Sequence, residues 1–177
     1  MRTEQIALMP RQVVSLGLLV ALPFLASAVG IAALSGERGN ASPDLNLVIA
    51  LSLLCVLVAG GLMLAIVARR SIVLAPDKLT VKHSFYTLDI VRSDASGAQV
   101  KRLHERREIG ISTKRNGVAA FGFYSGWFFA DGGKPCFCAV SALPVYAVYL
   151  PNNAECAVLA ISCTEEMAEA LREWARN

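Results

Sequence analysis

Charged side chains are scarce in this chain, and they are unevenly distributed. They make up 18% of the 177 residues, against about 25% in an ordinary soluble domain. Two long stretches, residues 12–34 and 45–68, contain no Asp, Glu, Lys, Arg or His. Because neither stretch offers an ionisable group for an ion path or a proton relay, the sequence argues against a pump or transporter.

Recognisable catalytic and metal-binding motifs are also lacking. The chain has two histidines and five cysteines, and no cysteine pair has the Cys-x2-Cys spacing typical of zinc sites. Cys136 and Cys138 are two positions apart in a predicted strand, so both side chains would point to one face and pack in the core. No local Cys–His pair suggests a nucleophile. We therefore expect no enzymatic activity, no metal and no cofactor, and reduced cysteines in a cytoplasmic domain.

The two uncharged stretches are long enough to cross a membrane. At about 1.5 Å per residue, a helix of either length spans a hydrocarbon layer about 30 Å thick. We predict two transmembrane helices, over residues 12–34 and 45–68, joined by a loop over residues 35–44. A cleaved signal peptide is the alternative for the first stretch, but its apolar core of about 22 residues exceeds the usual length of roughly 7–15.

Basic residues flank the outer ends of this predicted hairpin. Arg2 and Arg11 precede the first stretch and Arg69 and Arg70 follow the second, whereas the loop carries only Arg38. Because Lys and Arg concentrate on the cytoplasmic side, we expect a multi-pass inner-membrane (plasma-membrane) protein with both termini in the cytoplasm. Small residues at four-residue spacing in both stretches favour close helix packing within the hairpin, with a homo-oligomer as the alternative.

After residue 70 the uncharged runs give way to alternating polar and apolar residues, a pattern typical of half-buried strands. The sequence therefore divides into a two-span transmembrane hairpin, residues 1–70, and a cytoplasmic domain, residues 71–177. Turn signals rich in Gly, Pro, Asn and Asp separate about seven predicted strands in this domain.

The end of the chain predicts one amphipathic helix, from about residue 164 to residue 176. Met167, Leu171 and Trp174 recur at helical spacing and form one apolar stripe. Ser162 and Glu165 have the spacing of a capping box at its start. The domain is thus expected to be α+β, with strands followed by a closing helix.

Three short motifs stand out between residues 122 and 151. A Gly-Trp-Phe segment enters a predicted strand, a Gly-rich hairpin follows, and a later strand ends in Tyr-Leu-Pro; the residues are Gly126, Trp127, Phe128, Gly132, Gly133, Tyr149 and Pro151. With the closing helix, they resemble the bacterial PH-like (pleckstrin-homology-like) domain family of small membrane proteins. The clear match covers residues 116–176. The resemblance implies a partly open antiparallel β-barrel of about seven strands capped by the C-terminal helix, with nothing catalytic.

Basic residues cluster between residues 101 and 115, interrupted by Glu105 and Glu108. Close to a membrane, such a cluster contacts anionic headgroups, each contact contributing about 1 kcal/mol; the ordinary alternative is a solvated loop. Nucleic-acid binding is not expected, because the segment lacks a recognition helix or an RNA-binding aromatic motif. The candidate lipid or partner contacts are Lys101, Arg102, Arg106, Arg107, Lys114 and Arg115.

The densest aromatic stretch, residues 121–129, has two interpretations. Aromatic side chains can anchor a protein at headgroup depth, but we expect most of these rings in the core, with Tyr124 or Phe129 as surface contacts. We predict a protein-interaction or assembly module at the cytoplasmic face, and a sensor of anionic lipid headgroups as the alternative. The expected partners are membrane lipid and a membrane or cytoplasmic protein that the sequence does not identify.

Overall fold

The computed structural model describes residues 1–36 and 43–176. The chain divides into two compact units, one formed by Val13–Val67 and the other by Met1–Gln12 together with Ala68–Asn177. We call these the helical unit and the β domain. The predicted division at residue 70 therefore differs from the structure at the N-terminus, because residues 1–12 belong with the β domain.

Two long helices, α1 (Pro10–Gly36) and α2 (Pro43–Ala68), form the helical unit, except that the first turn of α1 (residues 10–12) and the last residue of α2, Ala68, belong to the β domain. They cover both uncharged stretches, so the helical conformation predicted there is confirmed. Pro10–Ser27 of α1 is long and apolar enough to cross a membrane, although a signal sequence meets the same criterion. The apolar stretch found in α2, Ile49–Leu62, is shorter. Two charged residues of the predicted loop, Glu37 and Arg38, lie outside the described residues, and the third, Asp44, lies in the first turn of α2.

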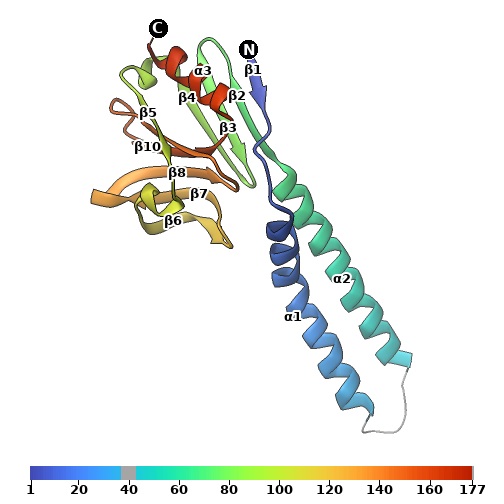
Figure 1. The fold of residues 1–177 in the computed structure, drawn as a ribbon. Coiled ribbons are helices and arrows are strands. Elements are labelled where there is room, and N and C mark those ends of the chain that lie inside the picture. The colour runs from blue at the N-terminus through green and yellow to red at the C-terminus, as the bar shows by residue number, and fades with distance from the viewer. Residues whose placement is uncertain (37–42, 177) are drawn as a thin grey trace. The chain divides into compact units, whose positions relative to one another are not determined.

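The β domain is an α+β fold with two sheets and a C-terminal helix (Figure 1). Its four-stranded sheet has the order β1-β2-β3-β4, with antiparallel neighbours throughout. The strands are β1 (Arg2–Glu4), β2 (Arg70–Leu74), β3 (Lys78–His83) and β4 (Tyr86–Val91). The last three lie at the start of the region, after residue 70, in which polar–apolar alternation predicts strands.

The second sheet has six strands in the order β5-β9-β10-β8-β7-β6. Strand β10 lies between β9 and β8, antiparallel to the first and parallel to the second. The strands are β5 (Gln99–Leu103), β6 (Ile111–Ala120), β7 (Phe123–Ala130), β8 (Lys134–Val140), β9 (Val145–Tyr149) and β10 (Val158–Ser162).

The expectation of about seven antiparallel strands is wrong in two respects. From residue 70 onward the described residues contain nine strands, β2 to β10, with β1 added from the N-terminal segment, and β8 and β10 pair in parallel. Alternation shows which face of a strand is buried, but it does not specify the neighbouring strand. β9 follows β8 in the chain without pairing with it, and β10 fills the position between them. In the described residues the two sheets do not close into a barrel.

Two apolar clusters cover the two faces of the six-stranded sheet. Phe137 belongs to a cluster that also contains Ile72 and Val81 of the four-stranded sheet and Leu171 of the C-terminal helix. Its neighbour Cys138 belongs to the second cluster. Consecutive residues of a strand point to opposite faces, so this sheet is buried on both sides at its centre, which explains the continuous apolar sequence of β8.

The C-terminal helix α3 (Glu165–Arg176) buries Met167, Leu171 and Trp174, as its apolar stripe predicts. The predicted capping box is wrong. Thr164 precedes the helix and its Oγ1 accepts a hydrogen bond from the Met167 amide at 3.3 Å. Ser162 is instead the last residue of β10, and its hydroxyl donates to the Ala142 carbonyl at 2.5 Å.

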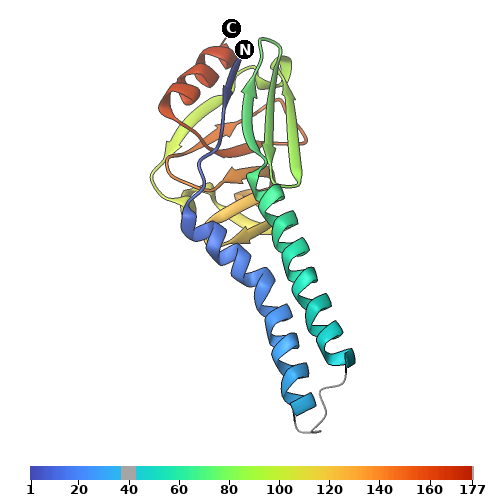
Figure 2. The same ribbon diagram turned by 90° about the vertical axis from the view of Figure 1, so that its right-hand side faces the viewer.

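The N-terminal segment is built into the β domain. β1 pairs with β2, and Ile6 is 1% exposed within the first apolar cluster. The Glu4 carboxylate accepts hydrogen bonds from the Thr164 amide (2.8 Å) and hydroxyl (2.7 Å) at the start of α3. Figure 2 shows this segment running beside β2 and α3. A carboxylate at this position stabilises the helix N-terminus, because it accepts from otherwise unpaired donors and complements the helix dipole.

Three of the basic residues that predicted the topology make hydrogen bonds inside the β domain. The Arg2 guanidinium donates to the Glu166 carbonyl at 2.9 Å, and that of Arg70 to the Ile6 carbonyl at 3.0 Å. The Arg69 guanidinium donates to the Thr87 hydroxyl at 3.0 Å. These arginines therefore join the segments before α1 and after α2 to one folded domain.

Candidate functional site

The structure does not gather the predicted basic cluster into one patch. Lys101 and Arg102 lie on β5, whereas Lys114 and Arg115 lie on β6. These are the two edge strands of the six-stranded sheet, with four strands between them. Clustering in the sequence therefore does not become clustering in space.

Individual members of the cluster differ in their surroundings. Arg102 forms an ion pair with Glu165 of α3 at 3.5 Å. Arg107 lies in the short 3-10 helix Arg106–Ile109 and is exposed, as are Lys101, Lys114 and Arg115. Within the described part of the chain, these last four basic residues form no ion pair. The side chain of Arg106 lies outside that part.

The Gly-Trp-Phe motif supports packing. The ring of Trp127 meets that of Phe137 edge to face, with centroids 5.1 Å apart, and Phe128 is 1% exposed in the second cluster. Gly126 has φ +107°, and an added Cβ would lie 2.7 Å from the Asn116 carbonyl oxygen. Only glycine fits this conformation and this close approach. The motif thus holds β7 against β6 and β8.

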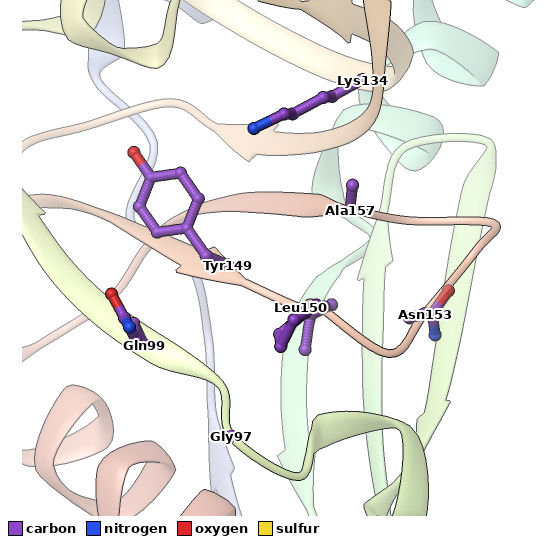
Figure 3. A pocket seen from close by; sticks show the side chains of 8 residues that line it. Gly97, Gln99, Lys134, Tyr149, Leu150, Asn153 and Ala157 are labelled. Atoms are coloured by element: carbon purple, nitrogen blue, oxygen red, sulfur yellow. The ribbon is translucent and has the colours of Figure 1, made fainter.

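The other two motifs meet at a pocket of about 470 Å3, shown in Figure 3. Tyr149 and Pro151 belong to the Tyr-Leu-Pro motif, and Lys134 follows directly after Gly132 and Gly133. Both glycines have positive φ, +74° and +71°, which lets the chain turn sharply before β8. The lining residues are Gly97, Gln99, Lys134, Tyr149, Leu150, Pro151, Asn153 and Ala157.

This pocket combines apolar lining residues with hydrogen-bond donors that have no partner among the described residues. Leu150, one of the apolar lining residues, is 2% exposed. The Lys134 ammonium is its one formal charge. Within the described residues, the side chains of Lys134, Gln99 and Tyr149 make no hydrogen bond, whereas Asn153 Oδ1 already accepts from the Glu155 (3.0 Å) and Cys156 (2.8 Å) amides. A polar or anionic group of a partner would find uncommitted donors here.

Sequence reasoning singled out Tyr149 and Pro151 only as fold markers and missed Gln99 and Lys134. A usable signal existed for Lys134, because it follows two glycines at a predicted turn and so stands at the entry of a strand. Gln99 had no such signal. Its position follows from the pairing of β5 with β9, which places Gln99 opposite Tyr149.

Side chains with strongly shifted pKa values lie in the interior, not in the pocket. Burial, together with the nearby Arg70 charge, lowers the pKa of His83 to about 3, and its ring stacks on Phe123 at 4.8 Å. Neither ring nitrogen has a hydrogen-bond partner among the described residues. Burial raises the pKa of the Cys156 thiol to about 12. A buried neutral imidazole and a buried neutral thiol are typical of core residues.

Cys136 and Cys138 share one face of β8, as predicted, with their sulfur atoms 3.6 Å apart. Hydrogen bonding between the two thiols and burial raise the pKa of Cys138. Across the described residues, no group of three or more His, Cys, Asp or Glu side chains is arranged to hold a metal ion.

Comparison with known proteins assigns no relative to this chain: protein-family models, curated proteins and solved structures were searched, and none matches.

Proposed function

We propose that α1 and α2 form a transmembrane hairpin in the plasma membrane and that both termini lie in the cytoplasm. The observation that carries this proposal is that residues 1–12 and residues from 68 onward belong to one folded domain. A folded domain lies on one side of a membrane, so an even number of crossings must separate its two parts. Two helices meet that requirement. Cleavage of α1 as a signal peptide would remove β1 and the buried Ile6 from the domain.

The β domain, in this proposal, is a PH-like domain that acts as a protein-interaction or assembly module. Its order of strands followed by one closing helix supports the likeness, as does the packing of α3 against the core between the sheets. The parallel β8–β10 pair and the six-stranded second sheet are additions to the pattern that the resemblance implies.

Binding, rather than catalysis, is the role we assign to the pocket beside Tyr149. Active sites usually place groups with perturbed pKa values in a cleft. Here such groups, His83 and Cys156 among them, are buried in the core. The pocket instead offers an ammonium, a phenol and an amide beside apolar surface, a combination that suits recognition of a partner.

Co-purification of the full-length protein from native membranes, with mass spectrometry of proteins and lipids, tests this function. The double variant Lys134→Ala/Tyr149→Ala is expected to reduce recovery of a recurrent protein partner about tenfold or more, as loss of a central contact does. Lys82→Ala, on the outer face of the four-stranded sheet, serves as the control and should leave recovery unchanged. Equal recovery of a partner with the unaltered protein, the double variant and Lys82→Ala would contradict the role assigned to the pocket.

A second candidate function is the binding of anionic lipid headgroups. It is favoured by the exposed, unpaired state of Lys101, Arg107, Lys114 and Arg115 in the described structure. Their separation onto two sheet edges counts against a single binding patch. In the same co-purification, anionic lipid enriched without a protein partner and lost on neutralising Arg107, Lys114 and Arg115 would support this second function instead.

A further inference from the structure

Three large apolar side chains are exposed at turns of the β domain. Phe85 is 57% exposed, Phe121 58% and Leu143 54%. Phe85 lies in the turn between β3 and β4, Phe121 in that between β6 and β7, and Leu143 in the connection from β8 to β9. A single exposed apolar residue is ordinary, but a group at one end of a domain marks a surface that contacts something apolar.

Hydrogen bonds join these turns to the two places where the chain leaves the β domain. The Ser84 amide, in the β3–β4 turn, donates to the Arg69 carbonyl at 2.8 Å. Gln12, the last residue of the domain before the helical unit, donates through Nε2 to the carbonyls of Phe121 (3.5 Å) and Ser141 (2.7 Å). Ser141 is the first residue after β8. The three turns therefore lie at the end of the domain from which the chain continues into α1 and α2.

The backbone of the β6–β7 turn makes an aromatic residue there costly. Phe121 has φ +51° and Gly122 φ +77°, as in a two-residue hairpin turn that favours Asn-Gly. A bulky residue at positive φ is strained, and the exposed ring of Phe121 adds little to the core. Folding alone does not account for an aromatic side chain at this position, whereas a contact outside the domain does.

Charge at the same end fits a membrane surface. Arg11 and Arg69 are exposed and immediately adjoin the two chain exits. The hydrogen bond from Arg69 to Thr87 holds its guanidinium near the β3–β4 turn. Exposed arginines beside exposed apolar side chains complement a bilayer, in which anionic headgroups lie over the apolar acyl chains.

We propose that Phe85, Phe121 and Leu143 form an interfacial anchor that inserts into the headgroup region of the lipid bilayer. The anchor rests on the proposed function, in which α1 and α2 span that bilayer. Its three side chains enter from separate turns, so they hold this end of the β domain against the membrane surface and restrict its rotation about the two exits.

Depth-dependent quenching of tryptophan fluorescence tests the anchor in proteoliposomes of the full-length protein. Phe85→Trp and Phe121→Trp report on the two turns, and the bilayer carries bromine atoms near the top of the lipid acyl chains. Val91→Trp is the matched control, because Val91 is 49% exposed at the other end of β4. Leu57→Trp, at an exposed position of α2, reports on the helical unit. The emission of the native tryptophans is subtracted from each.

The fluorescence added by Phe85→Trp and Phe121→Trp should be quenched at least about twofold more than that added by Val91→Trp, since anchoring side chains lie about 5–10 Å into the headgroup and acyl boundary. Equal quenching at the three positions, with strong quenching of Leu57→Trp, would overturn the anchor and leave the membrane-spanning function standing. Absence of quenching at Leu57→Trp, in a protein that does not float with the liposomes, would overturn both. If the tryptophans at the turn positions are instead shielded from solvent in detergent, and more so at higher protein concentration, a second copy of the chain and not lipid covers them. That result would also overturn the anchor.

Discussion

Ile6→Ala is expected to destabilise the β domain by about 2–5 kcal/mol, the usual cost of truncating a fully buried aliphatic side chain. Ile6 is 1% exposed in the cluster that joins the two sheets and α3, although both long helices separate it in sequence from most of that cluster. Urea unfolding of the full-length protein in detergent micelles measures the effect. Both tryptophans, Trp127 and Trp174, lie in the β domain, so their emission reports its unfolding.

Gln5→Ala provides the control for this measurement. Gln5 precedes Ile6 and is exposed, so its truncation should change the free energy of unfolding by no more than about 0.5 kcal/mol. Equal unfolding curves for Ile6→Ala and the unaltered protein would mean that the N-terminal segment is not part of the folded domain.

Gly126→Ala is expected to destabilise the β domain by about 3 kcal/mol or more, through backbone strain and overpacking together. Gly126 has φ +107°, which alanine rarely adopts, and the new Cβ would lie 2.7 Å from the Asn116 carbonyl oxygen and 2.8 Å from the Tyr86 ring. Relief requires β6 to move away from β7, and that movement would also disturb the 3.0 Å hydrogen bond from the Tyr86 hydroxyl to the Asn116 side chain.

The same substitution at Gly132 separates the two contributions. Gly132 also has positive φ, +74°, but an added Cβ meets no atom within 4 Å. Gly132→Ala should therefore show only the conformational cost, about 1–2 kcal/mol, in the same unfolding experiment. A loss for Gly126→Ala no larger than that for Gly132→Ala would contradict the close packing of β6 on β7.

Much of the secondary structure could be predicted from the sequence, because periodicity reflects burial directly. The polar–apolar alternation after residue 70 predicted strands there, and in β3 it corresponds to the burial of Leu79 and Val81. The spacing of Met167, Leu171 and Trp174 predicted the buried stripe of α3. Long uncharged stretches marked both helices. In each case the signal comes from residues close together in the chain and needs no knowledge of a distant partner.

What the sequence did not predict depends on residues far apart in the chain. Ser162 and Glu165 had the spacing of a capping box. In the structure, Glu4 of the N-terminal segment accepts a hydrogen bond from the Thr164 amide at the start of α3. The Ser162 hydroxyl instead donates to the Ala142 carbonyl in the β8–β9 connection. The short β1 carries no alternation long enough to detect. The parallel pairing of β10 with β8 depends on the order of strands in the sheet, which local patterns do not determine.

The candidate site, too, could be predicted where its signal is local in the sequence and not where it depends on distant residues. The Tyr-Leu-Pro motif and the glycines before Lys134 were visible as motifs, but only the folded chain brings Tyr149, Lys134 and Gln99 to one pocket. Conversely, basic residues that cluster in the sequence become dispersed, because β5 and β6 form opposite edges of their sheet. Proximity in sequence was misleading where two neighbouring strands do not pair.

The transmembrane hairpin is tested most directly by finding on which side of the membrane the two parts of the β domain lie. Gln5→Cys and Lys114→Cys introduce a thiol at exposed positions before α1 and after α2. Each is exposed to a membrane-impermeant maleimide in plasma-membrane vesicles sealed in either orientation. With a transmembrane hairpin and both termini in the cytoplasm, both thiols should react in inside-out vesicles and neither in right-side-out vesicles. Reaction of the two thiols from opposite sides, or loss of the Gln5→Cys segment from the mature protein, would contradict this topology.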